Sequence, residues 1–227
     1  MNDTDAPADA ATLPEALRLS PVEARVLGSL IEKEATTPDQ YPLTENALTL
    51  ACNQKTSRDP VMELSSGEVG HALRQLEPRQ MVRSQHASRA QRWEHRFAQT
   101  YAITAQQQAA LCVLLLRGPQ TLGEVFSRCE RIGRFSGADE VRHALDRLAQ
   151  RSPALVTMLP RAAGQREDRW MHLLCGTPDL EALAASAAAR PAGGGASAEL
   201  LSRIEALEAR VAALEARCAA PGATGET

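Results

Sequence analysis

The sequence predicts a mainly α-helical α+β fold that is built from two similar units. Residues 65–76 (SSGEVGHALRQL) return as residues 137–148 (GADEVRHALDRL), with the shared pattern Glu-Val-x-His-Ala-Leu-x-x-Leu. A second pattern, Arg-Trp-x-His, occurs at residues 92–95 and again at residues 169–172. Two matches in the same order indicate an internal duplication. Aromatic residues make up only 3% of the chain, so Leu, Val, Ile and Ala must fill the core, which favours helices over sheets.

The repeated stretch has the apolar spacing of an amphipathic helix, with apolar residues at positions i, i+3, i+4 and i+7. One face of this helix should lie on a core and the other should face solvent. The residues expected to be buried are Val69, Leu73 and Leu76 in the first copy, and Val141, Leu145 and Leu148 in the second.

The first unit should begin after a disordered tail. Residues 1–16 are Ala, Asp, Thr and Pro without apolar periodicity, and cannot bury enough surface to offset the entropy of ordering. Ser20, Pro21 and Glu23 then form a strong helix start, with a cap, a first-turn proline and a capping-box glutamate. This helix should run to about residue 34.

Two more helices, a polar loop and a hairpin complete the first unit. A second helix is expected over residues 44–52, followed by a polar loop at residues 53–60 (NQKTSRDP) and by the repeated helix. Residues 81–84 and 93–103 alternate apolar and polar side chains, which predicts two strands joined by a polar turn.

The second unit repeats this plan. Thr104 with Gln107, and Thr121 with Glu124, have the spacing of capping boxes, and each should start a helix. The repeated helix follows, and then strands over residues 155–159 and 170–175 on either side of a polar tip at 161–168. Three helices followed by a hairpin is the order of a winged helix, in which the hairpin is the wing. We therefore expect two tandem winged-helix domains, at residues 17–102 and 103–176.

The C-terminal part has a different pattern. Residues 177–198 are rich in Ala and Gly and predict a linker. Residues 199–219 carry apolar positions spaced alternately by four and three, which predicts a coiled-coil helix, and residues 220–227 should be a disordered tail. The β-branched and leucine positions of the predicted coiled-coil helix favour a weak parallel homodimer. The proposed seam residues are Leu200, Ile204, Leu207, Val211 and Leu214.

Composition excludes several classes of function. The five cysteines stand far apart without a CxxC pair, so neither a redox motif nor a zinc site is expected, and no cofactor is predicted. The acidic start and the absence of a long apolar run predict a cytoplasmic protein with no membrane contact. We find no convergence of catalytic groups, and histidines that recur in both copies are more typical of structure than of catalysis. The expectation is a protein that is not an enzyme.

Local charge gives the best functional signal, because the net charge of −3 does not favour nucleic acid. The first hairpin carries five arginines between Arg79 and Arg96 against Glu94 alone. The candidate nucleic-acid-binding residues are Lys55 and Arg58 in the polar loop, His71, Arg74 and Gln75 on the third helix, and Arg83, Arg89, Arg92 and Arg96 in the hairpin. A solvated hairpin without a partner is the alternative, and Trp93 and Trp170 are better explained as apolar anchors than as base-stacking platforms.

The motifs YPLTENAL and NQKTSRDP, within residues 19–77, resemble the bacterial YceH family, a family of unknown function. The resemblance extends to about residue 175. It implies a pair of winged-helix domains and supplies no activity, substrate or catalytic residue.

Two functional hypotheses follow. The first is a DNA-binding or transcription-associated protein that binds duplex DNA weakly, mainly through phosphates, with the first wing. The alternative is a protein-interaction scaffold or assembly subunit whose partner is an unidentified protein, with no nucleic-acid contact. A basic hairpin favours the first hypothesis, whereas an exposed apolar patch would favour the second.

Overall fold

The computed structural model describes residues 13–86, 90–161 and 167–181. The chain divides into two compact units, Met1–Pro178 and Asp179–Thr227, and the description below concerns the first. The five proposed coiled-coil residues and most of the predicted linker lie outside the described residues. The predicted α+β class is confirmed, because the first unit combines helices with small antiparallel sheets.

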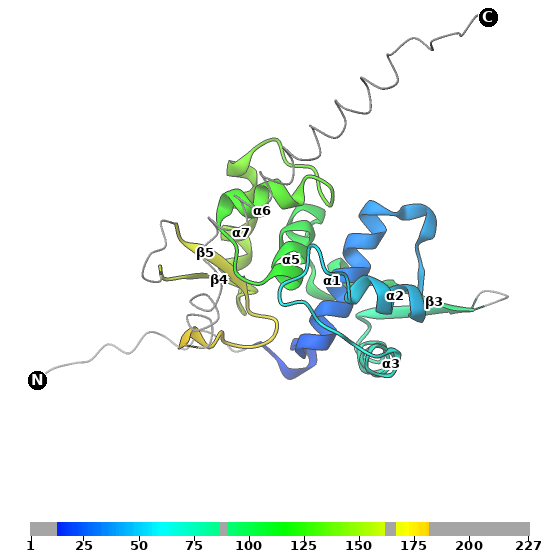
Figure 1. The fold of residues 1–227 in the computed structure, drawn as a ribbon. Helices are drawn as coiled ribbons and strands as arrows, with labels where there is room; N and C mark the ends of the chain where they lie inside the picture. The colour runs from blue at the N-terminus through cyan, green and yellow to red at the C-terminus, as the bar shows by residue number, and fades with distance from the viewer. Residues whose placement is uncertain (1–12, 87–89, 162–166, 182–227) are drawn as a thin grey trace, which may run out of the picture. The chain divides into compact units, whose positions relative to one another are not determined.

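Each half of the first unit contains three longer helices followed by a β-hairpin (Figure 1). The first half comprises α1 (Pro21–Thr36), β1 (Leu43–Thr44), α2 (Glu45–Cys52), α3 (Ser66–Leu76), β2 (Val82–His86), β3 (Gln91–His95) and the short α4 (Phe97–Tyr101). The second half comprises α5 (Ala105–Arg117), α6 (Leu122–Cys129), α7 (Ala138–Ala149), β4 (Val156–Leu159) and β5 (Arg169–His172). The 3₁₀ turns Glu15–Leu17 and Pro38–Gln40 flank α1.

Local sequence sets where the helices begin. Capping boxes start α1, α3, α5 and α6 at Ser20, Ser65, Thr104 and Thr121, as their sequences predict. In each case the hydroxyl accepts from the backbone N–H three residues on, and the side-chain oxygen of the Glu or Gln at that position accepts from the backbone N–H of the capping residue. The predicted buried face of the repeated helix is confirmed, since its six apolar residues are fully buried in α3 and α7.

The second hairpin strand of the first half is shorter than predicted. The expectation of a strand through residue 103 is wrong, because β3 ends at His95 and α4 follows. Phe97 and Tyr101 are spaced for alternation in a strand, but their i, i+4 spacing also places them on one face of a helix. Both side chains are buried, and their ring centroids lie 4.7 Å apart.

Part of the predicted N-terminal tail is folded. Leu13 is buried, and the Tyr101 hydroxyl donates to the Leu17 carbonyl at 2.6 Å. The backbone N–H of Leu19 donates to the Leu174 carbonyl at 2.7 Å, which joins the start of the first half to the end of the second. The expectation that disorder extends to residue 16 is therefore wrong for residues 13–16.

In both halves the tryptophan of the second hairpin strand pairs with a backbone segment that precedes the second helix. In the first half the sheet order is β1-β3-β2, and Leu43 of β1 pairs with Trp93. In the second half Gln120 forms an isolated bridge with Trp170, in the sheet formed by β4 and β5. Both tryptophans are buried, as expected of apolar anchors. The sequence did not predict the short β1 pairing.

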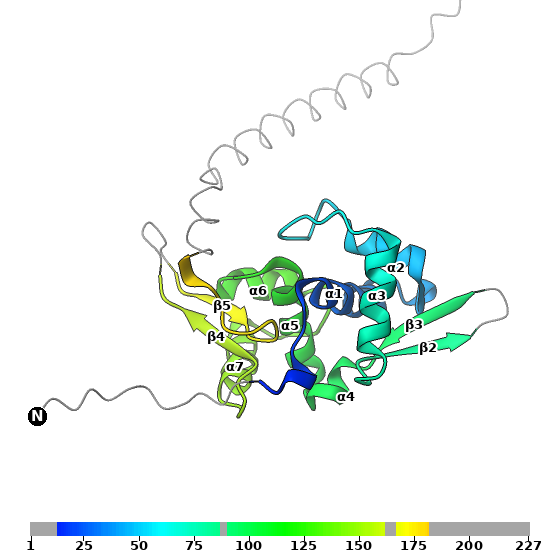
Figure 2. The same cartoon turned by 90° about the horizontal axis from the view of Figure 1, so that it is seen from below.

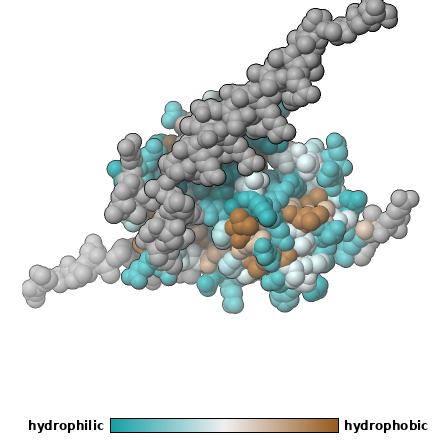
Figure 3. Space-filling view, in the orientation of Figure 1, coloured by the Kyte–Doolittle hydropathy of each residue, from teal (hydrophilic) through white to brown (hydrophobic). Residues whose placement is uncertain are grey.

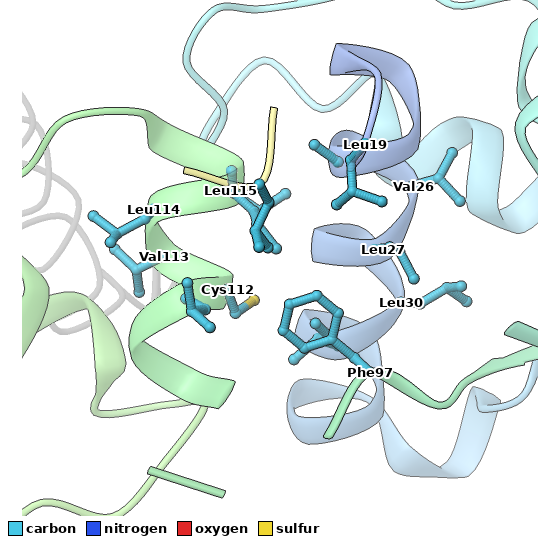
Figure 4. Packing of buried hydrophobic residues seen from close by; sticks show 14 of the residues in the cluster. Leu19, Val26, Leu27, Leu30, Phe97, Cys112, Val113, Leu114 and Leu115 are labelled. Atoms are coloured by element: carbon cyan, nitrogen blue, oxygen red, sulfur yellow. The ribbon is translucent and has the colours of Figure 1, made fainter. Parts of the chain in front are cut away.

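Helices α1 and α5 lie side by side between the remaining elements of the two halves (Figure 1). Figure 4 shows Leu27 and Leu30 of α1 and Cys112 of α5 in one apolar cluster, with the Phe97 ring between the two helices. The helices approach closely at Gly28, where an added Cβ atom would lie 2.9 Å from Leu116 Cδ2. The Cys112 thiol donates to the Gly28 carbonyl at 3.3 Å. One continuous apolar core spans both halves.

Replacing Gly28 with Leu should lower the free energy of unfolding by about 1–3 kcal/mol, because the side chain must push α5 away from α1. Chemical denaturation measures this change. Gly123→Ala in α6 is the control, since nothing lies within 4 Å of the added Cβ, and it should leave stability unchanged or slightly higher. Equal stability of the Gly28→Leu protein and the wild type would contradict the close packing.

Candidate nucleic-acid interface

The exposed face of α3 carries three of the predicted contact residues. His71, Arg74 and Gln75 are exposed, whereas Val69 and Leu73 on the opposite face are fully buried. A hollow of about 750 Å³ lies between this face and the first turn of α1. The arrangement leaves the side chains on this face open to a partner, and their role in binding stays a prediction.

Carboxylates surround the start of α3. Glu68 is exposed and caps the helix by accepting from the backbone N–H and hydroxyl of Ser65. Glu45 of α2 accepts from the Ser66 hydroxyl at 2.7 Å. A Cβ atom added to Gly70 would lie 3.0 Å from Glu45 Oε2 and 3.2 Å from Arg74 Nη1, so both side chains border Gly70 without forming an ion pair. Negative charge here opposes a close approach of phosphate to the helix start.

The hairpin β2–β3 carries exposed cations next to this face. Arg83 in β2 and Arg96 directly after β3 are exposed, and neither side chain has a hydrogen bond or ion pair among the described residues. Arg89 lies outside the described residues. Figure 2 shows the hairpin extending beyond α3. A single binding partner could therefore contact both α3 and the hairpin.

Arg92, predicted as a phosphate contact in the hairpin, does not lie on an exposed tip. It is half-buried in β3, and its Nη1 donates to the Pro42 carbonyl at 2.7 Å. Arg169, at the equivalent position of β5, donates from Nη1 to the Pro119 carbonyl at 3.1 Å. The same contact in both halves indicates that Arg92 fixes the hairpin to the segment before α2.

Arg92→Ala should therefore lower the free energy of unfolding by about 1–2 kcal/mol, because it leaves the Pro42 carbonyl without its charged donor. Arg83→Ala, on the neighbouring strand of the same hairpin, should change stability by less than about 0.5 kcal/mol. Thermal or chemical unfolding of the two variants tests the difference. Equal stability of the two would show that the contact of Arg92 contributes nothing.

Arg58 is also placed differently from the prediction. Its side chain has 0% exposure and forms an ion pair with Glu32 of α1 at 2.6 Å. It also donates to the carbonyls of Ala51 and Ser57 and to the side chain of Gln54. A guanidinium that is buried and fully used in this way cannot reach a phosphate, which corrects its assignment as a contact residue. Lys55 in the same loop is exposed.

The two copies of the Arg-Trp-x-His histidine have diverged. His95 Nδ1 accepts from the Phe97 backbone N–H, so its Nε2 carries the proton toward Glu34 Oε2 at 2.8 Å. The hydrogen bond from His95 lowers the pKa of Glu34. His172 is buried, and its Nδ1 has no partner among the described residues. Burial lowers the pKa of His172 to about 4.

His172 should make stability depend on pH. Its pKa lies at about 4 in the folded chain against 6.5 in the unfolded chain, so the unfolded chain binds the proton first on acidification. The free energy of unfolding therefore has its full value, as far as His172 is concerned, above pH 6.5, and it decreases as the pH falls toward 4. Between about pH 7 and pH 5 the loss should be about 2 kcal/mol.

Denaturant titrations of the wild type and of His172→Leu at both pH values measure this loss. The variant should lose less stability over the same interval, and His143→Ala, which removes an exposed histidine of α7, should behave like the wild type. Identical pH dependence of stability in His172→Leu and the wild type would show that His172 is not the cause of the loss.

Other chemistry is limited in the part of the chain that the structure describes. No group of three or more His, Cys, Asp or Glu side chains there could hold a metal ion. Burial raises the pKa values of Cys52, Cys112 and Cys129, which therefore act as small apolar side chains. No described helix has the length and hydropathy needed to cross a membrane.

Comparison with known proteins identifies relatives over most of the chain. Residues 19–165 match a family described as "Protein of unknown function, DUF480". A UPF0502 protein of Xanthomonas campestris is 57% identical over 200 residues, covering 87% of this chain and 89% of that protein. A UPF0502 protein of Stenotrophomonas maltophilia is 54% identical over 203 residues, covering 88% and 93%. One from Xanthomonas euvesicatoria is 60% identical over 169 residues, covering 74% and 75%.

Proposed function

The chain belongs to the DUF480 family of unknown function, which is the YceH family that its motifs resemble. From the charges and exposed side chains on the surface of this chain, we propose that it is a DNA-binding protein. Its two halves are tandem winged-helix domains that bind duplex DNA weakly, mainly through phosphates. The contact is made by α3 and by the first wing, β2–β3. This role would place the protein in transcription or another process on DNA.

The order of elements supports this proposal. In each half a third helix with an exposed polar face is followed directly by a hairpin, which is how helix-turn-helix proteins with a wing present a helix to a groove and a hairpin to the backbone. The first half has the more basic surface, because Arg161 of the second hairpin is neutralised by Asp168 at 2.8 Å.

The observation that carries the proposal is the division of the cations in the first half into two sets. Arg58, Arg79 and Arg92 use their guanidinium groups on carboxylates or carbonyls of the fold. Lys55, Arg74, Arg83 and Arg96 are exposed and have no hydrogen bond or ion pair among the described residues. Exposed, unpaired cations on a third helix and on the hairpin that follows it are the minimum that phosphate binding requires.

Sequence specificity should be low. Only His71, Arg74 and Gln75 are placed to reach base edges from α3, and Glu45 and Glu68 flank the start of that helix. Phosphate contacts position a protein on DNA but do not read its sequence. We therefore propose a binder with a broad preference, whose affinity is raised when the coiled coil predicted for residues 199–219 brings two chains to one duplex.

A protein-interaction scaffold is the second candidate, and exposed apolar side chains favour it. Leu50 of α2 is 66% exposed and Val61 of the following loop is 51% exposed. Figure 3 shows hydrophobic side chains on one face as small separate areas within a largely hydrophilic surface. A stable protein interface needs a contiguous apolar area, so this surface supports the scaffold less well than the unpaired cations support DNA.

Binding of the full chain to random duplex DNA, measured by fluorescence anisotropy as a function of salt, tests the proposal. If Lys55, Arg74, Arg83 and Arg96 each contact a phosphate, the slope of log K against log salt should be about −3 to −4. Arg83→Glu should reduce the affinity at low salt by more than tenfold, because it replaces a phosphate contact with a repulsion.

Arg161→Glu is the matched control. It makes the same change in net charge on the second hairpin, whose arginine is already paired, and should weaken binding much less. Equal effects of the two reversals would show that only net charge matters. If the wild-type chain does not bind duplex DNA at low salt, the proposal is lost and the scaffold takes its place.

A further inference from the structure

The loop between α2 and α3, residues 53–64, is closed at its neck by one side chain. Asn53 Nδ2 donates to the Leu64 carbonyl at 2.7 Å, and the Leu64 backbone N–H donates to Asn53 Oδ1 at 2.8 Å. Leu64 immediately precedes Ser65, the cap of α3. The loop is therefore a compact closed segment whose two ends meet at the start of the exposed helix.

Arg58 holds the middle of this loop to α1. Its Nη1 and Nη2 donate to the two oxygens of Glu32 at 3.0 and 2.6 Å. Its Nε and Nη2 both donate to the Ala51 carbonyl at the end of α2. A two-point ion pair with a fully buried guanidinium fixes both the position and the orientation of the loop. Ser57, beside it, has φ of 63°, a conformation that this packing maintains.

The far side of the loop is fastened to both halves of the protein. Arg25 of α1 is buried, and its Nη2 donates to the Pro60 carbonyl at 2.6 Å. The Asp59 backbone N–H donates to the Leu116 carbonyl of α5 at 2.8 Å. These two hydrogen bonds fix the far side of the loop to α1 and to α5.

The fastened loop exposes Lys55 and Thr56. Lys55 lies two residues beyond Asn53, so its Cα is within about 7 Å of the neck and hence close to the start of α3. A cation held there meets a phosphate at the ordering cost of its side chain alone, because the backbone of the loop is already fixed before binding.

We infer that the loop is a preformed phosphate contact, with Lys55 as the contact and with Arg58 and Glu32 as positioning residues. This inference rests on the proposed DNA binding and names the residues that prepare its surface. Arg58 acts without touching DNA, since its guanidinium is buried against Glu32.

Glu32→Ala separates positioning from charge, because the two effects have opposite signs. The variant removes a negative charge, so charge alone would strengthen DNA binding. Release of the loop would instead weaken binding by up to about tenfold at 50 mM salt, the loss expected of Lys55→Ala, which removes one phosphate contact. Glu32→Gln, which keeps one acceptor for Arg58, should have the same sign and a smaller effect.

A double-mutant cycle gives the decisive comparison. If Glu32 acts only by positioning Lys55, then Glu32→Ala should not weaken binding further in the Lys55→Ala background. The affinities of the wild type, the two single variants and the double variant are measured with the full chain and the same random duplex, with salt and temperature held constant.

Trypsin gives a readout that does not involve DNA. Cleavage after Lys55 should be slow in the wild type, because the loop is held on both sides, and at least tenfold faster in Glu32→Ala at a temperature where circular dichroism shows both chains folded. Glu32→Gln serves the same measurement if the alanine variant is not folded.

Stronger or unchanged DNA binding by both Glu32 variants, or losses that add in the double mutant, would overturn the positioning role while leaving the proposed function intact. Equal rates of cleavage after Lys55 in wild-type and variant chains would also overturn it. Absence of wild-type DNA binding would overturn the proposed function and this inference together.

Discussion

The close packing of α1 against α5 is the contact on which the rest of the structure depends. It is possible because Gly28 has no side chain where Leu116 approaches, and it merges the apolar residues of both halves into one cluster. The loop before α3 reaches α5 at Leu116, so its position is defined by the same packing. The two halves have the element order of separate small domains but share one apolar core. Neither half alone would bury its first helix completely, because the faces of α1 and α5 that contact each other would be exposed.

Local patterns were sufficient for the parts of the fold that depend on neighbouring residues. Capping boxes at Ser20 and Ser65, the buried stripe of α3 and its exposed polar face all follow from spacing along one helix. Sequence failed where a side chain finds its partner far along the chain. Nothing local indicates that Arg58 binds Glu32 or that Arg92 binds the Pro42 carbonyl. Charge in a polar loop predicts exposure, and only the tertiary structure shows otherwise.

The duplication separates structural residues from candidate contact residues. A contact that occurs in both halves, such as Arg92 with Pro42 and Arg169 with Pro119, is explained by the geometry of the repeated unit. Residues at equivalent positions whose surroundings differ give each half its own surface charge and titration behaviour. His95 has a carboxylate partner whereas His172 is buried without one, and the first hairpin has unpaired arginines where the second has an ion pair. The first half is thus the better candidate for binding a partner, and the second half is the better candidate for a structural role.

The hydrogen bond between the Leu19 N–H and the Leu174 carbonyl brings the beginning and the end of the folded body together. The order of the two halves along the chain is therefore not required by their packing. A circular permutant that starts at the second half, with residue 178 linked to residue 13 and a new break between α4 and α5, would retain the α1–α5 contact and both hairpins. In this respect the body resembles a dimer of two fused subunits, in which covalent connection supplies proximity and the helix interface supplies stability.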